Sequence, residues 1–500
     1  MKAILIITFQ LIVGILYSQQ SIIFKEPLKI MVEEKNISQL KKSEILILTK
    51  ISYHENRYGI FRTFITAKKN DGDTIELDYK EKNFNFIDVD NIYKVWDACL
   101  LKNGTYSNLL KEGYQYKLRN DFNNDALDYI NTLKENDLFF NDEFFEDYLY
   151  SLINKIHPGI LNDERPGNLF VKIIKDPEPN AFSLTNGCII ISTGLLSTIQ
   201  SEDELVGVLA HEIAHFALDH QLLNITKEKE RKKRAEFWSS FATVVAASAD
   251  AYLSYNNKNY VPGVLTYSTA IAAKTLSDEI VTRLGIKYDQ EQERQADWVS
   301  QEILTVLKYN KLGLSAALQR IQKYCINTGN YIALSGSGTH PSLDERISQL
   351  GQPTNIETFT QPDFLKKVSL INSYNSWIEL WYFAHHIAAI ELANRNITNG
   401  VATESDYIVK AVVKRRTSNT KESNEEVLEL FKKAQLLKVT PYIILSKEEG
   451  LTYIRLNNKI EAKKCFQTYL TALIELKNSS KAIEEEINWT KKMIFKVDNL

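Results

Sequence analysis

One pattern of five residues, His211-Glu212-Ile213-Ala214-His215, limits the local fold of this chain more than any other feature of its sequence. Side chains at positions i and i+4 lie on one face of an α-helix, so the two imidazoles reach a single cation only if this segment is helical. Neutral imidazole is a common ligand of Zn²⁺, and Glu212 beside it is placed to take a proton from water. The pattern therefore predicts a metal-binding helix with a general base.

The alternative is a pair of core or solvated histidines on an amphipathic helix. The chain has eight histidines, so a chance match is improbable, about one in a hundred by composition. The preceding sequence also favours the metal site. The run 181–193 is rich in β-formers and is divided by Asn186-Gly187, which is typical of a hairpin. Ser201-Glu202-Asp203-Glu204 then fits a capping box, so we expect a hairpin followed by a capped helix.

A catalytic zinc site needs a third protein ligand. His220 is a poor candidate, because it lies five residues beyond His215 and about 140° away around a continuous helix. Glu293 and Asp297 are better candidates, since they share one face of a predicted helix. One of them can bind the metal while the other hydrogen-bonds to a ligand. Without the histidine motif, this pair would indicate only a solvated helix face.

Four groups of residues occur in an order that resembles a known family: Asn180-Ala181-Phe182 with Gly194-Leu195-Leu196, His211-Glu212-x-x-His215, Glu293-x-x-Ala296-Asp297, and Thr339-His340-Pro341-Ser342 with Arg346. Over about residues 140–350 the chain is similar to the HtpX and CAAX prenyl endopeptidase family of zinc metallopeptidases. The resemblance implies a gluzincin-type domain with a small β-sheet and one Zn²⁺ per chain.

The resemblance also implies roles for individual residues. Glu293 would be the third zinc ligand, and Asp297 would contact a ligand without binding the metal. His340 would stabilise the oxyanion that develops on the substrate, and Arg346 would help to order that segment. An extended substrate would lie along an edge strand that contains Asn180, Ala181, Phe182 and Ser183.

The composition predicts a mainly helical α+β protein. Nineteen glycines and ten prolines in 500 residues are about half the usual share of ~12%, too few for a turn-rich all-β chain. The length suggests about three domains. We expect the following division: a signal peptide at 1–18, a β-rich module at 19–85 with a hairpin at Asp71-Gly72, a helical connection at 86–139, the peptidase domain at 140–350, a linker at 351–363 and a helical domain at 364–500.

The N-terminus reads as a secretory signal peptide, with Lys2 followed by an apolar stretch to Tyr17 and a small residue at Ser18. The alternatives are an uncleaved anchor or a buried N-terminal strand. Export leads to an oxidising compartment, but the four cysteines are widely spaced. We therefore expect buried free thiols, with one structural disulfide as the alternative.

The C-terminal region contains a repeat with a period of 35 residues. The aligned positions are Glu426, Val427, Phe431 and Ala434 with Glu461, Ala462, Phe466 and Tyr469. This spacing is typical of tetratricopeptide repeats, which stack to form protein-binding surfaces. The alternative is an irregular helical bundle. Soluble periplasmic members of the family, of the BepA type, resemble this arrangement of a peptidase domain joined to such repeats.

Two apolar segments, 237–249 and 261–273, are shorter than the ~20 residues that a membrane span needs. We expect them to form helices that cover the cleft or rest against a membrane or a partner. The net charge of −3 disfavours a nucleic-acid partner.

Two functions fit the sequence. The first is an exported zinc metalloendopeptidase that hydrolyses protein substrates in envelope quality control. The second is a chaperone-like assembly factor that binds envelope proteins through the helical repeats, with proteolysis secondary or absent. The presence of Glu212 favours the first, because an inactive relative often loses the general base. A repeat protein without zinc would require all four motifs to be accidental.

Overall fold

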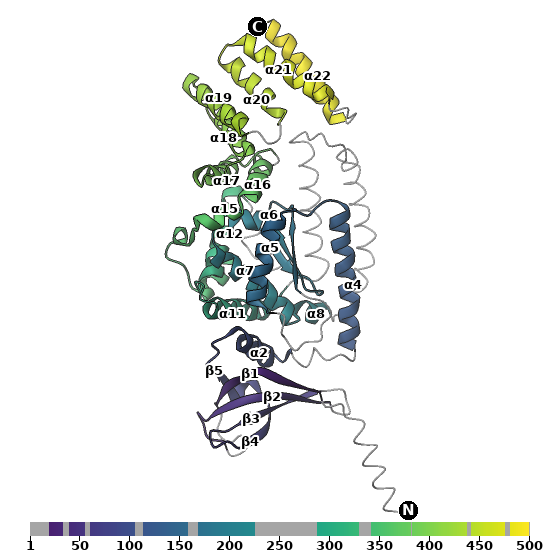
Figure 1. Ribbon diagram of the computed structural model, residues 1–500, viewed down its shortest axis with the longest axis vertical. Helices are drawn as coiled ribbons and strands as arrows, with labels where there is room; N and C mark the ends of the chain where they lie inside the picture. Colours follow the sequence, from purple (N-terminus) through teal and green to yellow (C-terminus); the bar gives the residue numbers. More distant parts are fainter. Residues whose placement is uncertain are drawn as a thin grey trace, which may run out of the picture.

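The computed structural model describes residues 20–33, 40–55, 61–105, 114–158, 169–225, 288–329, 342–381, 383–437, 442–475 and 481–499. A β-sheet module, a central region with a small sheet, and a stack of helices follow one another along the long axis (Figure 1). The prediction of a mainly helical chain is confirmed. The predicted signal peptide, the segment 237–273 and His340 lie outside the described residues.

The N-terminal module is a five-stranded antiparallel sheet with the order β4-β3-β2-β1-β5. Its strands are β1 (Gln20–Val32), β2 (Ile45–Glu55), β3 (Phe61–Lys68), β4 (Thr74–Asp78) and β5 (Phe84–Ile87), with the short helix η1 (Glu81–Asn83) before β5. The predicted hairpin at Asp71-Gly72 is confirmed, since β3 pairs with β4 and Ile65 lies opposite Leu77. The sheet buries one face around Leu48, Ile51 and Ile65.

Three helices link this sheet to the centre: α2 (Ile92–Lys102), α4 (Tyr114–Glu135) and α5 (Glu143–Ile156). Asp142 caps α5 by accepting a hydrogen bond from the Phe145 amide at 3.0 Å. The helix then buries Phe145, Leu149, Leu152 and Ile153 in the main core. Trp96 of α2 donates from its ring nitrogen to the Ile156 carbonyl at 2.8 Å, which ties α2 to the end of α5.

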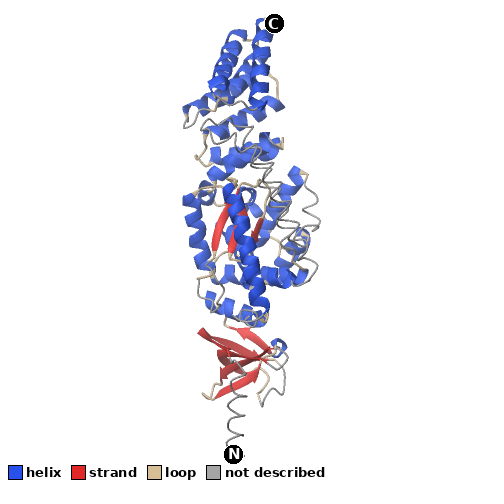
Figure 2. Ribbon diagram, turned by 90° about the vertical axis from the view of Figure 1, so that its right-hand side faces the viewer, coloured by secondary structure: helices blue, strands red, loops and turns tan. Residues whose placement is uncertain are grey.

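The central sheet has three strands, β6 (Phe170–Ile174), β7 (Ala181–Ser183) and β8 (Cys188–Ser192), in the order β6-β8-β7. The predicted hairpin at Asn186-Gly187 is confirmed, because β7 and β8 pair antiparallel. β6 runs parallel to β8, and all five residues of β8 are buried. This sheet lies among helices in the middle of the molecule (Figure 2).

The helices of the central region are α6 (Thr193–Thr198), α7 (Glu202–Ala217), α8 (His220–Ile225), α11 (Gln290–Val306), α12 (Gly313–Thr328) and α14 (Leu343–Leu350). Helix α7 packs against α11, α12, α5 and β7, so it is surrounded by other elements. Nearly every residue of α7 is therefore buried, including His211, Glu212 and His215.

The C-terminal part is helical throughout its described residues. It contains η2 (Ile356–Phe359), α15 (Pro362–Lys367), α16 (Ser369–Trp381), α17 (His386–Thr398), α18 (Glu404–Thr417), α19 (Lys421–Leu436), α20 (Ile444–Arg455), α21 (Lys459–Glu475) and α22 (Lys481–Asp498). Consecutive helices from α16 to α22 pack against one another. Equivalent repeat positions on α19 and α21 are buried: Val427, Phe431 and Ala434, and Ala462, Phe466 and Tyr469. The tetratricopeptide assignment stays a prediction.

The junction between the two helical regions is packed. Phe359 is buried, and the Gln361 amide donates to the Gln200 carbonyl at 2.9 Å. Phe364, Leu365, Val368 and Ile371 belong to the same hydrophobic core as α5, α7 and α11. The domain division at 351–363 stays a prediction, but the residues around it are not separated from the central region.

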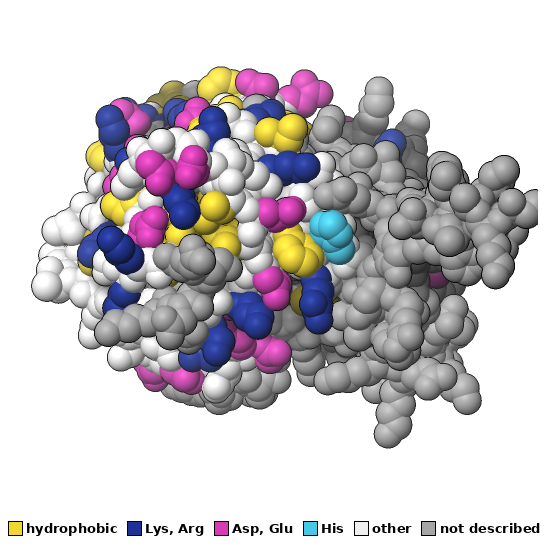
Figure 3. All heavy atoms as spheres, turned by 90° about the horizontal axis from the view of Figure 1, so that it is seen from below, with side chains coloured by type: hydrophobic (Ala, Val, Ile, Leu, Met, Phe, Trp, Pro, Cys, Tyr) yellow, Lys and Arg dark blue, Asp and Glu magenta, His cyan; other side chains and the backbone are white. Residues whose placement is uncertain are grey.

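The surface at the N-terminal end carries basic and acidic side chains interspersed among apolar ones (Figure 3). All four cysteines are free, as expected, and Cys99, Cys188 and Cys325 are buried. Within the described residues, no helix combines the length and the apolar character that crossing a membrane requires.

Candidate metal centre

Helix α7 begins after Ser201, as the sequence predicts, but Glu204 reaches the Gln200 amide instead of completing a capping box with the Ser201 amide. The Ser201 hydroxyl accepts a hydrogen bond from the Glu204 amide at 3.1 Å, and the Glu204 carboxylate accepts one from the Gln200 amide. Glu204 is completely buried and pairs with Arg320 of α12 at 2.7 Å. Burial raises the pKa of Glu204, and the charge of Arg320 opposes this effect. The cap therefore fixes both the start of α7 and its position against α12.

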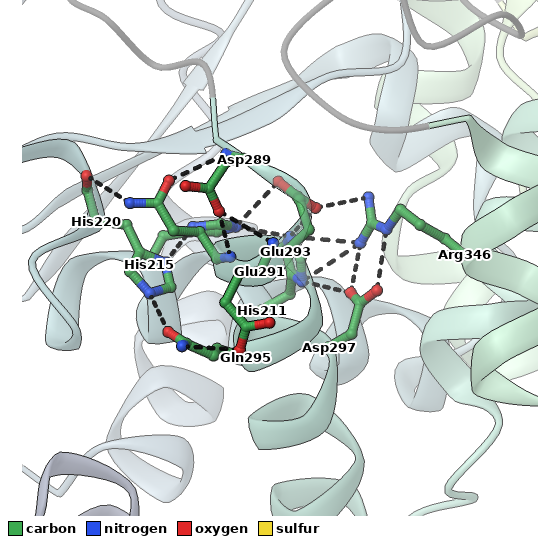
Figure 4. A network of polar contacts seen from close by, with 10 residues as sticks. His211, His215, His220, Asp289, Glu291, Glu293, Gln295, Asp297 and Arg346 are labelled. Carbon is green, nitrogen blue, oxygen red and sulfur yellow. Dashed lines mark hydrogen bonds and ion pairs between the residues drawn. The ribbon is translucent and has the colours of Figure 1, made fainter. Parts of the chain in front are cut away.

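The two histidines of α7 meet Glu293 of α11 (Figure 4). His211 Nε2 and His215 Nε2 are 3.0 Å apart; His211 Nε2 lies 3.5 Å from Glu293 Oε2, and His215 Nε2 lies 3.5 Å from the other oxygen, Oε1. Helix α11 is held in register by a complete capping box between Asp289 and Gln292. All three candidate ligands are buried. The structure thus brings together the three residues that the sequence suggested as ligands.

These distances fit a zinc ion. Ligand atoms at ~2.0–2.1 Å from a tetrahedral centre lie about 3.3 Å from one another, close to the 3.0 and 3.5 Å separations here. The Oε2 atom of Glu212 is buried and accepts no hydrogen bond from any described residue. Burial first, and then the charge of Glu293, raise the pKa of Glu212 well above its usual value. The donor set and this unsatisfied oxygen match a catalytic metal site.

Asp297 contacts His211 at Nδ1, and Arg346 contacts Asp297 in turn. Asp297 Oδ1 accepts from His211 Nδ1 at 2.9 Å. The Arg346 guanidinium donates to both oxygens of Asp297, at 2.6 and 3.1 Å, and Nη1 lies 3.3 Å from Glu293. Burial alone would raise the pKa of Asp297, but Arg346 and His211 outweigh it and hold the pKa well below its usual range. An ionised Asp297 orients His211 with Nε2 toward the cluster.

His220 lies against His215, which the sequence analysis did not expect. Helix α7 ends at Ala217, and Asp219 adopts a left-handed conformation with φ of 57° before α8 starts at His220. The angle of a continuous helix therefore does not apply. His220 Nδ1 is 2.9 Å from His215 Nδ1, and burial lowers the pKa of His220 to about 4. An aspartate just after a helix is only a weak signal for such a turn.

Tyr288 is a second residue that sequence reasoning missed. Its ring stacks on the His215 ring, with 3.6 Å between centroids and 15° between planes. Burial and the charge of Glu212 raise the pKa of Tyr288 well above its usual value. Tyr288 immediately precedes the cap of α11, so the element that carries Glu293 also covers His215. No sequence pattern marks this tyrosine.

The proposed edge strand lies next to Glu212, the candidate general base. β7 is one of the two outer strands of the three-stranded sheet, and the Ser183 backbone hydrogen-bonds to the Glu212 carboxylate. Ala181, Phe182 and Ser183 are all buried, and Asn180 is partly exposed. The structure brings this strand to the site but covers it. Arg346 reaches the site from α14, just beyond the segment of His340 that lies outside the described residues.

Comparisons with known proteins agree with this geometry. A family model described as Peptidase family M48 matches residues 151–354. Metalloprotease YcaL of Escherichia coli is 26% identical over 36% of this chain and 59% of its own length. Beta-barrel assembly-enhancing protease of E. coli is 20% identical over 50% of this chain and 48% of its own length.

Protease HtpX of Stenotrophomonas maltophilia is 29% identical over 37% of this chain and 66% of its own length. This chain therefore covers less than two thirds of the length of each of these relatives. The matched region contains the three candidate ligands, Glu212 and their supporting residues, and the names of the relatives describe proteases. Residues 151–354, about two fifths of the chain, thus match peptidase family M48, and the names of the relatives support a metalloprotease.

Proposed function

We propose that this chain is an exported zinc metalloendopeptidase that hydrolyses peptide bonds in proteins of the cell envelope. One observation carries the proposal: three buried ligand atoms converge at separations that suit zinc, beside an unsatisfied oxygen of Glu212. A bound zinc ion would supply Lewis-acid chemistry at a peptide carbonyl. His211, His215 and Glu293 would hold this ion, one per chain.

Glu212 would act as the general base. Its buried Oε2 atom accepts no hydrogen bond from the described residues, so it can take a proton from water and later give it to the leaving amine. Burial and the charge of Glu293 both raise the pKa of Glu212. His340 would donate to the oxyanion of the substrate, where the loss of one donor typically costs ~10²–10³ in rate.

A substrate would bind as an added strand on β7. Strand addition uses main-chain hydrogen bonds, which gives affinity with loose sequence preference. The Ser183 backbone contacts the Glu212 carboxylate, so a peptide paired with β7 would bring its backbone to the general base. Because β7 is buried, this pairing requires a movement that opens the edge of the sheet.

Separate observations support the proposed location and partners. The apolar stretch after Lys2 supports export with cleavage near Ser18, to the periplasm or to the periphery of the outer membrane. The helices of 364–500 support a protein partner held by tetratricopeptide-like repeats. The name of the E. coli relative, beta-barrel assembly-enhancing protease, supports envelope proteins as substrates. We propose membrane or cleft contacts for the segment 237–273.

The second candidate is a chaperone-like assembly factor that works through the C-terminal helices without cleavage. Successive packed helices from α16 to α22 favour it, because such stacks present extended surfaces to proteins. This candidate predicts that client proteins depend on the chain but not on Glu212.

The test measures zinc content and client turnover in the wild type and in Glu212→Gln. We expect about one zinc per chain in both proteins and accumulation of uncleaved clients on the variant. Glu302→Gln, which makes the same change on α11 beside a separate cavity, is the control and should turn clients over normally. Absence of zinc, or normal turnover in Glu212→Gln, would reject the peptidase. Normal client turnover in a Glu212→Gln protein that still binds zinc would favour the assembly factor.

A further inference from the structure

The two candidate histidine ligands are supported by different chemistry. The Nδ1 atom of His211 faces a carboxylate, Asp297, at 2.9 Å. The Nδ1 atom of His215 instead faces another imidazole nitrogen, His220 Nδ1, at 2.9 Å. Both His215 and His220 are about 1% exposed, so water does not take the place of this contact. The role of His220 Nδ1, as donor or as acceptor, therefore decides which nitrogen of His215 carries the hydrogen.

Gln295 determines which nitrogen of His220 carries the hydrogen. Its Nε2 atom donates to Glu291 Oε1 at 3.2 Å, which turns the amide oxygen toward His220. His220 Nε2 lies 3.0 Å from this oxygen (Figure 4). An amide oxygen only accepts, so His220 Nε2 must carry the hydrogen. In a neutral imidazole the other nitrogen is then an acceptor, and His220 Nδ1 accepts from His215 Nδ1.

We propose that His220 and Gln295 form a relay of positioning residues that holds His215 as the tautomer protonated on Nδ1, which leaves the Nε2 lone pair for zinc. This inference rests on the proposed zinc site and deepens it. A histidine ligand normally needs such a partner on its second nitrogen, which fixes both the tautomer and the ring orientation. Asp297 does this for His211 with a charged group, and His220 does it for His215 with a neutral one.

The fold holds the relay at three points. The left-handed turn at Asp219 points His220 back toward α7, and Arg119 of α4 fixes this turn through a buried ion pair with Asp219 at 2.5 Å. The Tyr288 ring stacks on His215 and limits its rotation. Gln295 lies on α11, two residues after Glu293, so one helix supplies both the third candidate ligand and the end of the relay.

The test compares zinc affinity, measured by competition with a chelator, in four purified full-length variants and the wild type. His220→Phe keeps an aromatic ring but removes the acceptor, and we expect zinc affinity to fall ~10–100-fold. His220→Asn offers an amide oxygen near the position of Nδ1, and we expect affinity within about threefold of wild type, a rescue that a purely structural role would not give. Gln295→Met should lie between the two.

His157→Phe is the matched control, because it makes the same change at a buried histidine that packs on Trp96 at the end of α5. We expect wild-type zinc affinity for this variant. The second readout is the visible spectrum of the cobalt-substituted protein, which reports ligand geometry directly. It should change in His220→Phe and return toward wild type in His220→Asn. Melting of the metal-free proteins separates loss of the relay from loss of the fold.

Wild-type affinity and an unchanged cobalt spectrum in His220→Phe would overturn the relay and leave the zinc site intact. Equal weakening in His220→Asn and His220→Phe, with equal melting of the metal-free proteins, would also overturn it, because the acceptor would then be irrelevant. A wild-type chain that binds no zinc would overturn the proposed function, and the relay with it. If His220→Phe does not fold, His220→Asn and Gln295→Met decide the question.

Discussion

Glu293 and Glu448 are both buried glutamates on helices, but their surroundings differ. Glu448 of α20 pairs with the Arg415 guanidinium of α18, so one negative charge meets one positive charge. Around Glu293, the described residues place three buried carboxyl groups, those of Glu212, Glu293 and Asp297, near one buried guanidinium, that of Arg346. The carboxyl groups of this cluster therefore outnumber its guanidinium groups.

This difference separates a structural site from a functional one. Buried charges usually occur in pairs, because an unpaired charge costs several kcal/mol to bury. In the C-terminal helices a single buried carboxylate, that of Asp406, accepts hydrogen bonds from Ser373, Asn396 and the Thr403 amide. In the central region the same residue types leave an excess of negative charge at one point. That excess of carboxyl groups, rather than burial itself, is what a bound cation would balance.

The largest expected effects come from neutralising Glu293 and Glu448, each in a separate variant. Glu293→Gln should weaken zinc binding more than ~100-fold, since groups that only contact a ligand already contribute 10–100-fold. Glu448→Gln should leave zinc affinity unchanged but destabilise the fold by about 3–5 kcal/mol, because Arg415 stays buried without its partner. Zinc titration and denaturant unfolding measure the two effects. Loss of zinc affinity in Glu448→Gln would contradict the expectation that, of these two glutamates, only Glu293 affects zinc binding.

Asp297→Asn tests the support of His211. The change keeps the shape but removes the charge that faces His211 and Arg346, and we expect zinc affinity to fall ~10–100-fold. The metal-free protein should also lose stability, since Arg346 is then short of a partner. Chelator competition and thermal melting report these changes. Zinc affinity equal to wild type would mean that Asp297 serves only Arg346.

Two glycines in helix contacts offer a matched pair. A Cβ at Gly207 of α7 would lie 2.6 Å from the Leu314 backbone nitrogen, whereas a Cβ at Gly450 of α20 would lie 2.9 Å from the Phe466 ring. A backbone moves less easily than a side chain, so Gly207→Ala should destabilise by about 2–3 kcal/mol and Gly450→Ala by about 1 kcal/mol. Only Gly207→Ala should also weaken zinc binding, because it shifts the helix of His211. Denaturant unfolding ranks the two, and the reverse order would contradict the expectation.

The smallest expected effect is a change in the free energy of unfolding with pH, caused by Glu449 of α20. Burial raises its pKa to about 7, and a hydrogen bond from Gln435 only partly opposes this. The folded state therefore binds this proton more tightly than the unfolded state, whose pKa is ~4.3. The stabilisation is complete below ~4.3 and is lost as the pH rises through about 7. Between pH 5 and pH 8 we expect unfolding to become easier by roughly 1–2 kcal/mol.

Glu449→Gln is the control for this prediction. It keeps a polar group opposite Gln435 but cannot titrate, so the fall in stability from pH 5 to pH 8 should be smaller in the variant by the same amount. The wild type and the variant are compared at each pH, which cancels the other titrating groups of the chain. Equal pH profiles for the two proteins would show that Glu449 keeps an ordinary pKa.

Local patterns predicted much of this site. The capped start of α7, both hairpins and the shared helix face of Glu293 and Asp297 each depend on residues within a few positions of one another. The structure has all of them. Such features are decided by local hydrogen bonds and helix geometry, which sequence spacing describes well.

Contacts between distant segments were not predictable in this way. His220 reaches His215 only because α7 stops at Ala217, and Gln295 reaches His220 across 75 residues of sequence. Phe144 adjoins the buried Phe145 in an apolar part of α5 but is 76% exposed, since the cap at Asp142 starts the helix with this side chain outside the core. Sequence spacing reveals the period of a helix, but it does not reveal where the helix ends or which elements pack against it.

Helix α16 has a further consequence for the whole molecule. Its first turn places Ile371 in the core of the central region, and its last turns place Trp377 and Leu380 in the core of the C-terminal helices. Asn375 in between donates to the Ser197 hydroxyl at 2.8 Å. A single rigid rod of about 20 Å thus spans both cores. If the distal helices hold a protein as proposed, the fixed position of α16 sets the distance from that protein to the metal centre, and the length of its unfolded segment would then matter more than its sequence.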